Sequence, residues 1–258
     1  MYTLGIDIGS TTTKCVILED GKHIVAHKLQ VGGIGTNVVE QLLKDLMEVA
    51  GLSRNDISAT TVTGYGRKIY KEAETEVSEL TCHALGCRFL FEDVNTVIVI
   101  GGQDIKIITL NKNGGMKNFL MNDKCAAGTG RFLDVMARIL NLEIHELEVY
   151  ASQATNSASI SSTCTVFAES EVISQLATGV ELPDLVAGIC DSVSSRVSAL
   201  AKRANAKEPI CMSGGVARNS AVREGIGRGL GTTILYDKYS QYFGAIGASI
   251  WAYRQMKK

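Results

Sequence analysis

Two cysteines in this sequence are followed by the same kind of segment. Cys125 lies in the small-residue stretch 121–131, just ahead of an amphipathic run at 132–140, and Cys164 lies just ahead of a second apolar run at 166–178. This order predicts that each thiol is held at the start of a helix. A helix N-terminus carries about half a positive charge and unpaired N–H groups. It therefore stabilises a thiolate, which is the form of cysteine that binds soft metals.

An iron–sulfur cluster is the chemistry that such a pair of thiols favours. Cys125 and Cys164 make half of the usual four cysteine ligands, and a homodimer would supply the other half by symmetry. Most single cysteines fill apolar cores, however, so from these residues alone filler and ligand are equally compatible. The remaining cysteines are predicted not to bind a metal: Cys15, Cys82, Cys87, Cys190 and Cys211.

A short turn after the predicted strand 2–8 has the composition of a phosphate-binding loop. Its backbone N–H groups and hydroxyls come from Gly9, Ser10, Thr11, Thr12 and Thr13. Backbone N–H groups that converge in such a turn bind anions. Lys14 is a candidate counter-charge, and Asp7 suits Mg²⁺, which prefers carboxylate and water ligands.

Two further glycine turns follow predicted strands. The turn after strand 94–100 contains Gly101, Gly102 and Gln103 and would bind the phosphates from a second lobe. The turn after strand 210–212 contains Gly214, Gly215 and Val216 and would let the backbone approach a nucleoside. One isolated glycine turn is most often a plain hairpin, but three in this order favour a nucleotide site. The sequence has neither a Walker A pattern nor a Rossmann fingerprint.

An internal repeat links the first two turns. Residues 4–14 align with residues 96–106, and each copy reads as strand, glycine-rich turn and strand. Two such units predict two related lobes: lobe I from residues 1–93 and 240–258, and lobe II from residues 94–239. Helices alternate with strands, which makes the fold class α/β. Further helices are predicted at 37–50, 77–91, 144–154, 184–204, 217–229 and 241–256, and further strands at 15–18, 22–31, 57–63, 105–110, 116–121 and 232–236.

The composition excludes several classes of function. The chain of 258 residues is 45% hydrophobic and 21% charged, which is typical of a soluble globular protein. A formal net charge of -1 gives no electrostatic basis for binding nucleic acid or acidic membranes. No segment approaches the roughly 20 apolar residues of a membrane span. A strand begins at once at the N-terminus, so no signal peptide is expected and a cytoplasmic location is predicted.

The three turns resemble the two phosphate loops and the adenosine loop of the actin/Hsp70/sugar-kinase superfamily. The segments 122–134 and 161–171, which carry the two cysteines, are far more specific. They resemble the activators (component A) of 2-hydroxyacyl-CoA dehydratases, in the BadF/BadG/BcrA/BcrD ATPase family. The resemblance covers essentially the whole chain, including residues 241–248. It implies a two-lobed, ribonuclease-H-like α/β fold with the nucleotide in the cleft between the lobes, and it assigns Gln241 to the nucleotide site.

The resemblance also implies a function. Such activators are homodimeric, oxygen-sensitive one-electron donors of anaerobic metabolism, in which one [4Fe-4S] cluster bridges the two subunits, and Cys125 and Cys164 match its ligands. Binding and hydrolysis of ATP, with Mg²⁺, drive an electron from a ferredoxin or flavodoxin to a partner 2-hydroxyacyl-CoA dehydratase. Val99 stands where the second phosphate loop usually has an acid. Catalysis is therefore expected to depend on Asp7 and on Gln103 or Asp104.

Other functions stay open from the sequence. Related activators serve aromatic-ring reductases or double-cubane cluster proteins. A small-molecule kinase of the same fold would need a general-base carboxylate, and Val99 stands where one is expected. A nucleotide-sensing dimer or a structural zinc protein would need no catalytic residues.

Overall fold

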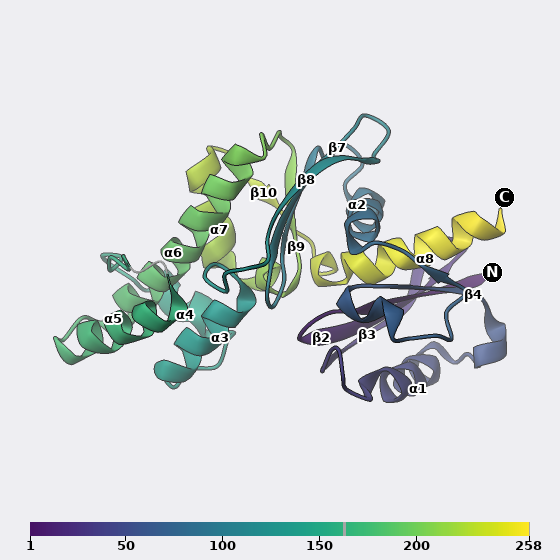
Figure 1. The fold of residues 1–258 in the computed structure, drawn as a ribbon, viewed down its shortest axis with the longest axis horizontal. Helices are drawn as coiled ribbons and strands as arrows, with labels where there is room; N and C mark the ends of the chain where they lie inside the picture. Colours follow the sequence, from purple (N-terminus) through teal and green to yellow (C-terminus); the bar gives the residue numbers. More distant parts are fainter. Residues whose placement is uncertain (162–163, 258) are drawn as a thin grey trace. The chain divides into compact units, whose positions relative to one another are not determined.

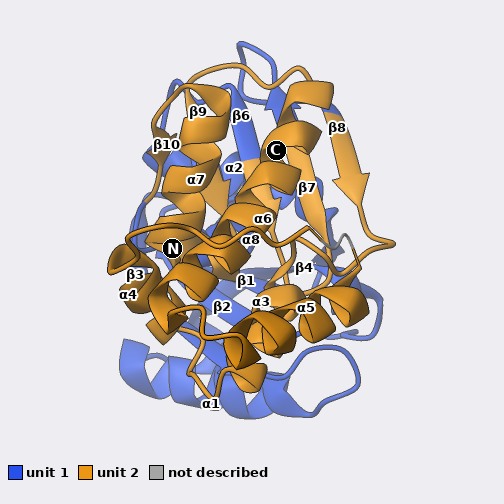
Figure 2. Cartoon of the chain, turned by 90° about the vertical axis from the view of Figure 1, so that its left-hand side faces the viewer, with its two compact units in different colours: residues 1–97, 108–118, 237–258 blue, residues 98–107, 119–236 orange. Residues whose placement is uncertain are grey.

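The computed structural model describes residues 1–161 and 164–257, so Ser162 and Thr163 of the second cysteine-led segment lie outside the described residues. The chain divides into two compact units, coloured separately in Figure 2. Unit 1 consists of Met1–Val97, Ile108–Asn118 and Asp237–Lys258, and unit 2 consists of Ile98–Ile107 and Phe119–Tyr236. The boundaries of the predicted lobes stay a prediction.

The first sheet has its strands in the order β3-β2-β1-β4-β5, of which Figure 1 labels β2, β3 and β4. These strands are β1 (Tyr2–Ile8), β2 (Thr12–Glu19), β3 (His23–Val31), β4 (Ile57–Thr63) and β5 (Thr75–Glu76). β1 pairs antiparallel with β2 and parallel with β4. Nearly every residue of β1 and β2 is buried, as expected for apolar strands at the centre of a covered sheet.

The helices of unit 1 are α1 (Val38–Ala50), α2 (Glu79–Leu90) and α8 (Phe243–Met256). α1 buries Leu42, Leu43 and Leu46, which lie on one face at helical spacing and pack into the core with β1 and β2. The helix ends at Gly51, whose φ of 65° is the left-handed conformation that glycine adopts without a steric penalty. These three leucines therefore form the buried face of α1, whereas Val49 is exposed.

α8 packs against β1 and α2 with no side chain between the backbones at the points of closest approach. A Cβ at Gly5 of β1 would overlap the backbone of α8. A Cβ at Gly86 of α2 would overlap the backbone of α8, and a Cβ at Gly247 of α8 would overlap the backbone of α2. Glycine at these positions is therefore what allows the elements to approach so closely.

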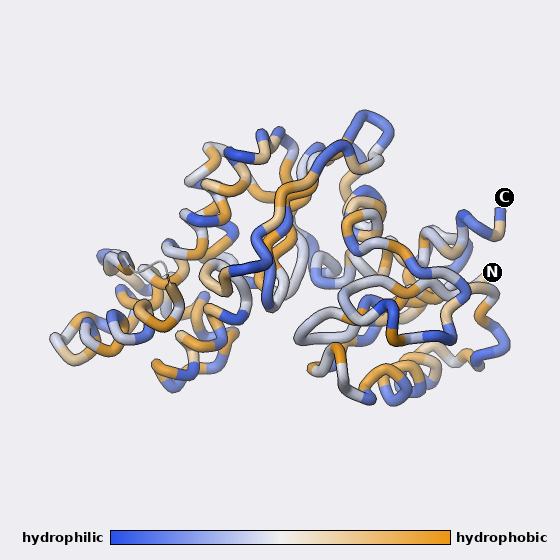
Figure 3. The backbone as a smooth tube through the Cα atoms, viewed as in Figure 1, coloured by the Kyte–Doolittle hydropathy of each residue, from blue (hydrophilic) through white to orange (hydrophobic). Residues whose placement is uncertain are grey.

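The second sheet has the strand order β10-β9-β6-β7-β8. Its strands are β6 (Thr96–Ile100), β7 (Ile105–Leu110), β8 (Met116–Asn122), β9 (Ile210–Ser213) and β10 (Ile234–Leu235). Figure 3 shows hydrophobic residues along the inner strands, whereas the connection between β7 and β8 is hydrophilic. β6 is buried throughout, which explains why its β-branched run was a clear strand signal.

The helices of unit 2 are α3 (Gly130–Ile139), α4 (Glu146–Ser152), α5 (Thr165–Ala177), α6 (Leu182–Arg203) and α7 (Ser220–Leu230). Their apolar faces form one core cluster with β6, β7 and β9. α3 and α5 pack against each other, and α6 packs along α7. Pro183 lies in the first turn of α6, where its missing N–H costs no hydrogen bond.

The predicted helices and strands are confirmed with small shifts at their ends, and three differences matter. β2 begins at Thr12 instead of residue 15, because Thr12–Lys14 pair with β3 and the last two of these residues also pair with β1. β5 was not predicted, since two residues carry no periodic signal. β10 is shorter than the predicted strand 232–236. None of the helices in the described part of the chain is long and apolar enough to cross a bilayer.

We expect Gly247→Ala to destabilise unit 1, because its Cβ would overlap backbone that cannot move aside. The free energy of unfolding, measured by denaturant titration, should fall by about 3 kcal/mol, the upper part of the range for overpacking. Gly115→Ala is the matched control, since its Cβ would first meet the side-chain amide of Asn111, at 3.1 Å. Equal stability of the two variants would contradict the close packing of α8.

Candidate functional site

The turn between β1 and β2 is held in one conformation by its own backbone and by the segment after β3. The N–H of Gly9 donates to the carbonyl of Thr12 (3.1 Å), and the N–H of Gly32 donates to the carbonyl of Thr11 (2.8 Å). A Cβ at Gly33 would overlap the backbone of Gly9 and Ser10. The turn therefore presents Ser10 and Thr11 on a rigid frame, with Thr11 exposed.

The next three residues of the predicted phosphate loop belong to β2. Thr13 is buried, and its hydroxyl donates to the carbonyl of Gly32 at 2.8 Å. Lys14 places its Nζ 3.7 Å from Asp7 Oδ2 and 3.4 Å from the carbonyl oxygen of Thr12. The ammonium group of Lys14 and the carboxylate of Asp7 therefore lie together below the turn, both largely buried.

The turn between β6 and β7 repeats the geometry of the first. The N–H of Gly101 donates to the carbonyl of Asp104 at 3.0 Å, the same hydrogen bond that Gly9 makes to Thr12. The predicted internal repeat is therefore confirmed at the level of the two hairpin turns. Gln103 is exposed at the tip, whereas Asp104 is buried at the start of the returning strand.

Each turn has a buried lysine paired with an acid, but the acid comes from a different strand. Lys106, which aligns with Lys14, binds Asp104 through Nζ and Oδ2 at 2.5 Å, and both side chains are at most 4% exposed. In the first turn the acid is Asp7, on the strand before the turn. In the second turn Val99 occupies the position of that acid, and Asp104, the residue just before β7, supplies the negative charge.

The third glycine turn follows β9 and requires glycine at one position. Gly214 has a φ of 91°, and a Cβ there would overlap the carbonyl of Ile100 at the end of β6. The turn continues as a 3₁₀ helix, Gly215–Arg218, in which Val216 is buried. The second and third predicted loops therefore lie side by side within unit 2.

Arg223 of α7 fixes the third turn and was not identified from the sequence. Its Nη1 donates to the carbonyls of Ala217 (2.5 Å) and Arg218 (2.9 Å), and its guanidinium lies 4.0 Å from the centre of the Tyr236 ring. Such stacking of a cation on an aromatic face is favourable. The only available signal was an arginine one turn into a helix that follows a glycine loop. This pattern does not identify the partner Tyr236, which is distant in sequence.

Gln241 lies in a 3₁₀ turn, Ser240–Tyr242, just before α8. His27 of β3 makes edge contacts with the rings of Tyr239 and Tyr242, at centroid distances of 5.2 and 4.7 Å. Burial, with smaller contributions from Lys238 and Lys28, lowers the pKa of His27, so the ring is neutral at pH 7. The aromatic contacts on both sides hold the turn that carries Gln241.

The start of α3 is bound to the second glycine turn through main-chain atoms. The N–H groups of Gly130 and Arg131 donate to the carbonyls of Gly101 and Gly102, each at 2.9 Å. These are two of the N–H groups that a helix leaves without an internal partner. Carbonyl groups of the second glycine turn already accept from these two N–H groups, so neither is left to donate to the thiol of Cys125.

The two predicted cysteine sites differ in their relation to the helices. Cys164 is the N-cap residue of α5, as predicted. Cys125 lies in the turn before α3, whose N-cap is Thr129, and its carbonyl accepts a hydrogen bond from Asn122 Nδ2 at 3.5 Å. Within the described residues, no three histidine, cysteine or acidic side chains come close enough to form a metal site.

Exposure separates these two cysteines from the others. Cys125 and Cys164 are exposed, whereas the other five are buried. Burial raises the pKa of Cys82 and of Cys190 to about 12, and it also raises the pKa of Cys15. A thiol with a raised pKa stays protonated at neutral pH and is a poor nucleophile and metal ligand. The prediction that Cys15, Cys190 and Cys211 are core residues is confirmed, since all three are buried.

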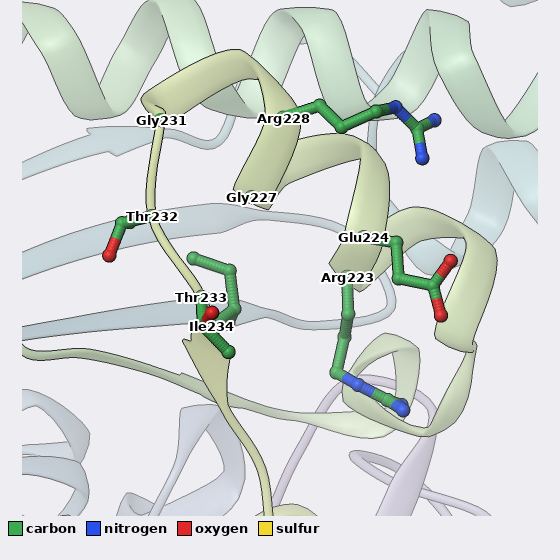
Figure 4. Close-up of a pocket in the computed structure, with 8 residues that line it drawn as sticks. All are labelled: Arg223, Glu224, Gly227, Arg228, Gly231, Thr232, Thr233 and Ile234. Carbon is green, nitrogen blue, oxygen red and sulfur yellow. The ribbon is translucent and has the colours of Figure 1, made fainter.

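A groove of about 690 Å³ lies beside α7, and Arg223, which fixes the third glycine turn, is one of its lining residues. Figure 4 shows Arg223 and Arg228 leaving α7 in different directions along it. Arg228 binds Asp191 of α6 at 3.1 Å, while Arg223 is engaged by the third glycine turn. No predicted nucleotide or metal residue lines this groove, so its arginines serve to hold neighbouring elements in place.

We expect only two thiols of the metal-free folded protein to react rapidly with iodoacetamide. Of the seven cysteines, only Cys125 and Cys164 are exposed, and the thiolate is the reactive form. Mass spectrometry of the alkylated chain should locate both modifications. The double variant Cys125→Ser/Cys164→Ser should lose the rapid phase, and rapid alkylation of Cys190 would contradict the assignment.

Comparison with known proteins agrees with this geometry. Residues 4–252 match the model of the BadF/BadG/BcrA/BcrD ATPase family. The "(R)-2-hydroxyglutaryl-CoA dehydratase activating ATPase" of Acidaminococcus fermentans is 50% identical over 259 residues, covering 100% of this chain and 99% of the relative.

Solved structures support the same conclusion. The activator of the 2-hydroxyisocaproyl-CoA dehydratase from Clostridium difficile, solved with bound ADPNP, superposes with a TM-score of 0.98 at 49% identity, covering 100% of this chain and 96% of that one. A ROK family glucokinase from Streptomyces griseus shares the fold alone, with a TM-score of 0.60 at 11% identity and coverage of 99% and 100%. The α/β fold of the actin/Hsp70/sugar-kinase superfamily is thereby confirmed. This chain is a member of the BadF/BadG/BcrA/BcrD ATPase family.

Proposed function

We propose that this protein is an ATP-dependent electron donor that activates a 2-hydroxyacyl-CoA dehydratase. The observation that carries the proposal is the pair of main-chain hydrogen bonds between the second glycine turn and the start of α3. They connect a phosphate-binding loop directly to the helix that follows Cys125. A change at the nucleotide therefore has a short physical route to a candidate cluster ligand. The names of the similar proteins support a dehydratase as the partner.

Three side chains of the two hairpin turns are assigned different tasks in ATP hydrolysis. Asp7, buried beside Lys14, binds the Mg²⁺ of the nucleotide, because a carboxylate is the ligand that this ion prefers. Gln103 is exposed at the tip of its turn and orients the attacking water. Asp104 is held by Lys106 and keeps the turn in shape. Position 99 holds a valine where an acid is expected, so in this proposal hydrolysis depends on how Gln103 orients the attacking water.

The phosphates are bound by the backbone N–H groups and hydroxyls of the first two turns. The predicted contributors are Gly9, Ser10, Thr11, Thr12, Thr13 and Lys14 from the first hairpin and Gly101, Gly102 and Gln103 from the second. The nucleoside is bound by Gly214, Gly215, Val216 and Gln241. Of these, Thr13 acts indirectly, since its hydroxyl already holds the carbonyl of Gly32.

Cys125 and Cys164 are the proposed ligands of a [4Fe-4S] cluster. Their exposure and soft donor atoms fit such a group, which supplies one-electron transfer at low potential when bound. Two ligands per chain require a second chain, and we place the homodimer contact at α5. This helix leaves large apolar side chains exposed directly after Cys164, namely Val166, Phe167, Ile173 and Leu176. Exposed apolar surface of this kind marks an interaction site.

Several properties follow from this proposal. A cluster held at exposed thiols between two subunits is open to oxygen, so the protein would act in anaerobic metabolism in the cytoplasm. A soluble carrier such as a ferredoxin or flavodoxin would supply the electron. The electron would then pass to the dehydratase when ATP changes the position of α3.

We expect about four irons per dimer after strictly anaerobic purification, with a brown colour that bleaches on reduction. The variants Cys125→Ser and Cys164→Ser should each lose iron and electron transfer while keeping their affinity for ADP. Cys190→Ala is the matched control, because this buried thiol should not contribute. Iron-free protein after anaerobic reconstitution would refute the electron donor and leave a kinase or nucleotide sensor of this fold.

A second prediction distinguishes the proposed catalytic role of Gln103 from the proposed structural role of Asp104. Gln103→Ala should lower the kcat of ATP hydrolysis by about 10²-fold, the usual effect of losing one positioned catalytic group, with little change in nucleotide affinity. Asp104→Asn should instead lower the free energy of unfolding, by about 3–5 kcal/mol, because it removes the carboxylate that binds the buried ammonium of Lys106. Full hydrolysis by Gln103→Ala would overturn its assignment.

A further inference from the structure

Asp7 lies between two glycines from distant parts of the chain. A Cβ at Gly64, directly after β4, would overlap the backbone carbonyl of Ile8 and would lie 2.5 Å from Asp7 Oδ1. A Cβ at Gly244, in the first turn of α8, would lie 2.6 Å from Asp7 Oδ2. Each oxygen of the carboxylate therefore lies against a stretch of peptide backbone that carries no side chain.

Both flanking glycines are fixed in place. The carbonyl of Gly64 accepts hydrogen bonds from Nη1 of Arg67 (2.9 Å) and from the N–H of Arg67 (3.3 Å). Gly64 also has a φ of 86°, which a residue with a Cβ rarely adopts. Gly244 belongs to the part of α8 that is in backbone contact with β1 and α2. Neither side of the carboxylate can move aside to make room for a methyl group.

We propose that Gly244 is a positioning residue for a Mg²⁺ ion bound at Asp7, and that the turn 64–67 supports the carboxylate from the opposite side. The inference rests on the proposed function, in which Asp7 binds the Mg²⁺ of ATP. This ion requires nearly ideal octahedral geometry with ligands at about 2.0–2.1 Å. The phosphates fix where the ion lies, so a carboxylate displaced by one methyl group no longer meets it.

The position of Gly244 in the sequence has no other evident reason. Glycine is a poor helix former, and alanine would favour α8. The three nearest atoms to a Cβ at this position are Oδ2, Cγ and Cβ of Asp7, at 2.6, 3.0 and 3.4 Å. At Gly247, by contrast, the Cβ would meet the backbone of α2. Gly247 therefore serves helix packing, whereas Gly244 serves the carboxylate.

Gly244→Ala tests the inference. The Mg²⁺ concentration for half-maximal ATP hydrolysis should rise by about 10–100-fold, the usual effect of disturbing a group that orients a metal ligand. Affinity for ADP in EDTA should stay within about twofold, because the phosphate loops are untouched. A merely structural role would weaken ADP binding with and without Mg²⁺ to the same extent, and that result would overturn the inference.

Asp7→Ala and the double variant Asp7→Ala/Gly244→Ala complete the cycle. If Gly244 acts through Asp7, its substitution should have no further effect once the carboxylate is gone, and additive effects would contradict this. Unchanged Mg²⁺ dependence in Asp7→Ala would refute the proposed role of Asp7 itself. An effect in Asp7→Ala but none in Gly244→Ala would refute only the present inference.

If Gly244→Ala fails to fold, the double variant still gives an answer. Removing the carboxylate removes the two closest atoms that the new methyl group would meet, so the double variant should fold as well as Asp7→Ala. A thermal unfolding midpoint equal to that of Asp7→Ala would support the contact. A double variant that also fails to fold would overturn the inference.

Discussion

The close approach of α8 to the backbones around it constrains the rest of unit 1. At Gly5, Gly86 and Gly247 there is no space for even one methyl group between neighbouring elements. Interiors are packed as densely as organic crystals, so such contacts fix the relative position of helices and strands to within a few tenths of an ångström. Dispersion forces act over many atom pairs at this distance. The carboxylate of Asp7 lies at the edge of the same packed region and takes its position from it.

The two hairpin turns share one backbone geometry but differ in the position and pairing of their acidic residue. Both have the same turn hydrogen bond and a buried lysine at the equivalent position, Lys14 or Lys106. In the second turn Asp104 forms a short ion pair with Lys106, so its carboxylate is already occupied. In the first turn the longer distance between Lys14 and Asp7 leaves the acid able to take another partner. Only the first turn is therefore suited to a divalent ion.

The local patterns of the sequence were sufficient to predict most of the helices and strands. Buried β-branched runs, the leucine stripe of α1 and the proline at the start of α6 each report one local preference, and the structure agrees with them. The repeated hairpins were visible for the same reason, since a strand and a glycine turn are short-range signals.

Features that depend on partners distant in sequence could not be predicted. Thr12–Lys14 extend β2 because β3 pairs with them, which no local rule requires. Cys125 was placed at a helix start because a small-residue stretch precedes an amphipathic run there. The carbonyls of Gly101 and Gly102, which accept from the first N–H groups of α3, are distant in sequence and left no local signal. Arg223 and Gly244 act through Tyr236 and Asp7, and neither pairing leaves a trace in spacing or composition.

The connection between α3 and the second glycine turn consists only of main-chain atoms. Peptide N–H and carbonyl groups are present whatever the side chains are, so no ordinary substitution at residues 130 and 131 except proline removes either donor. Related chains can therefore diverge along the rest of α3 without losing its attachment to the second glycine turn. The donors therefore survive substitution, but a Cβ at residue 130 would lie 3.1 Å from the carbonyl oxygen of Gly101 and would press on the acceptor itself.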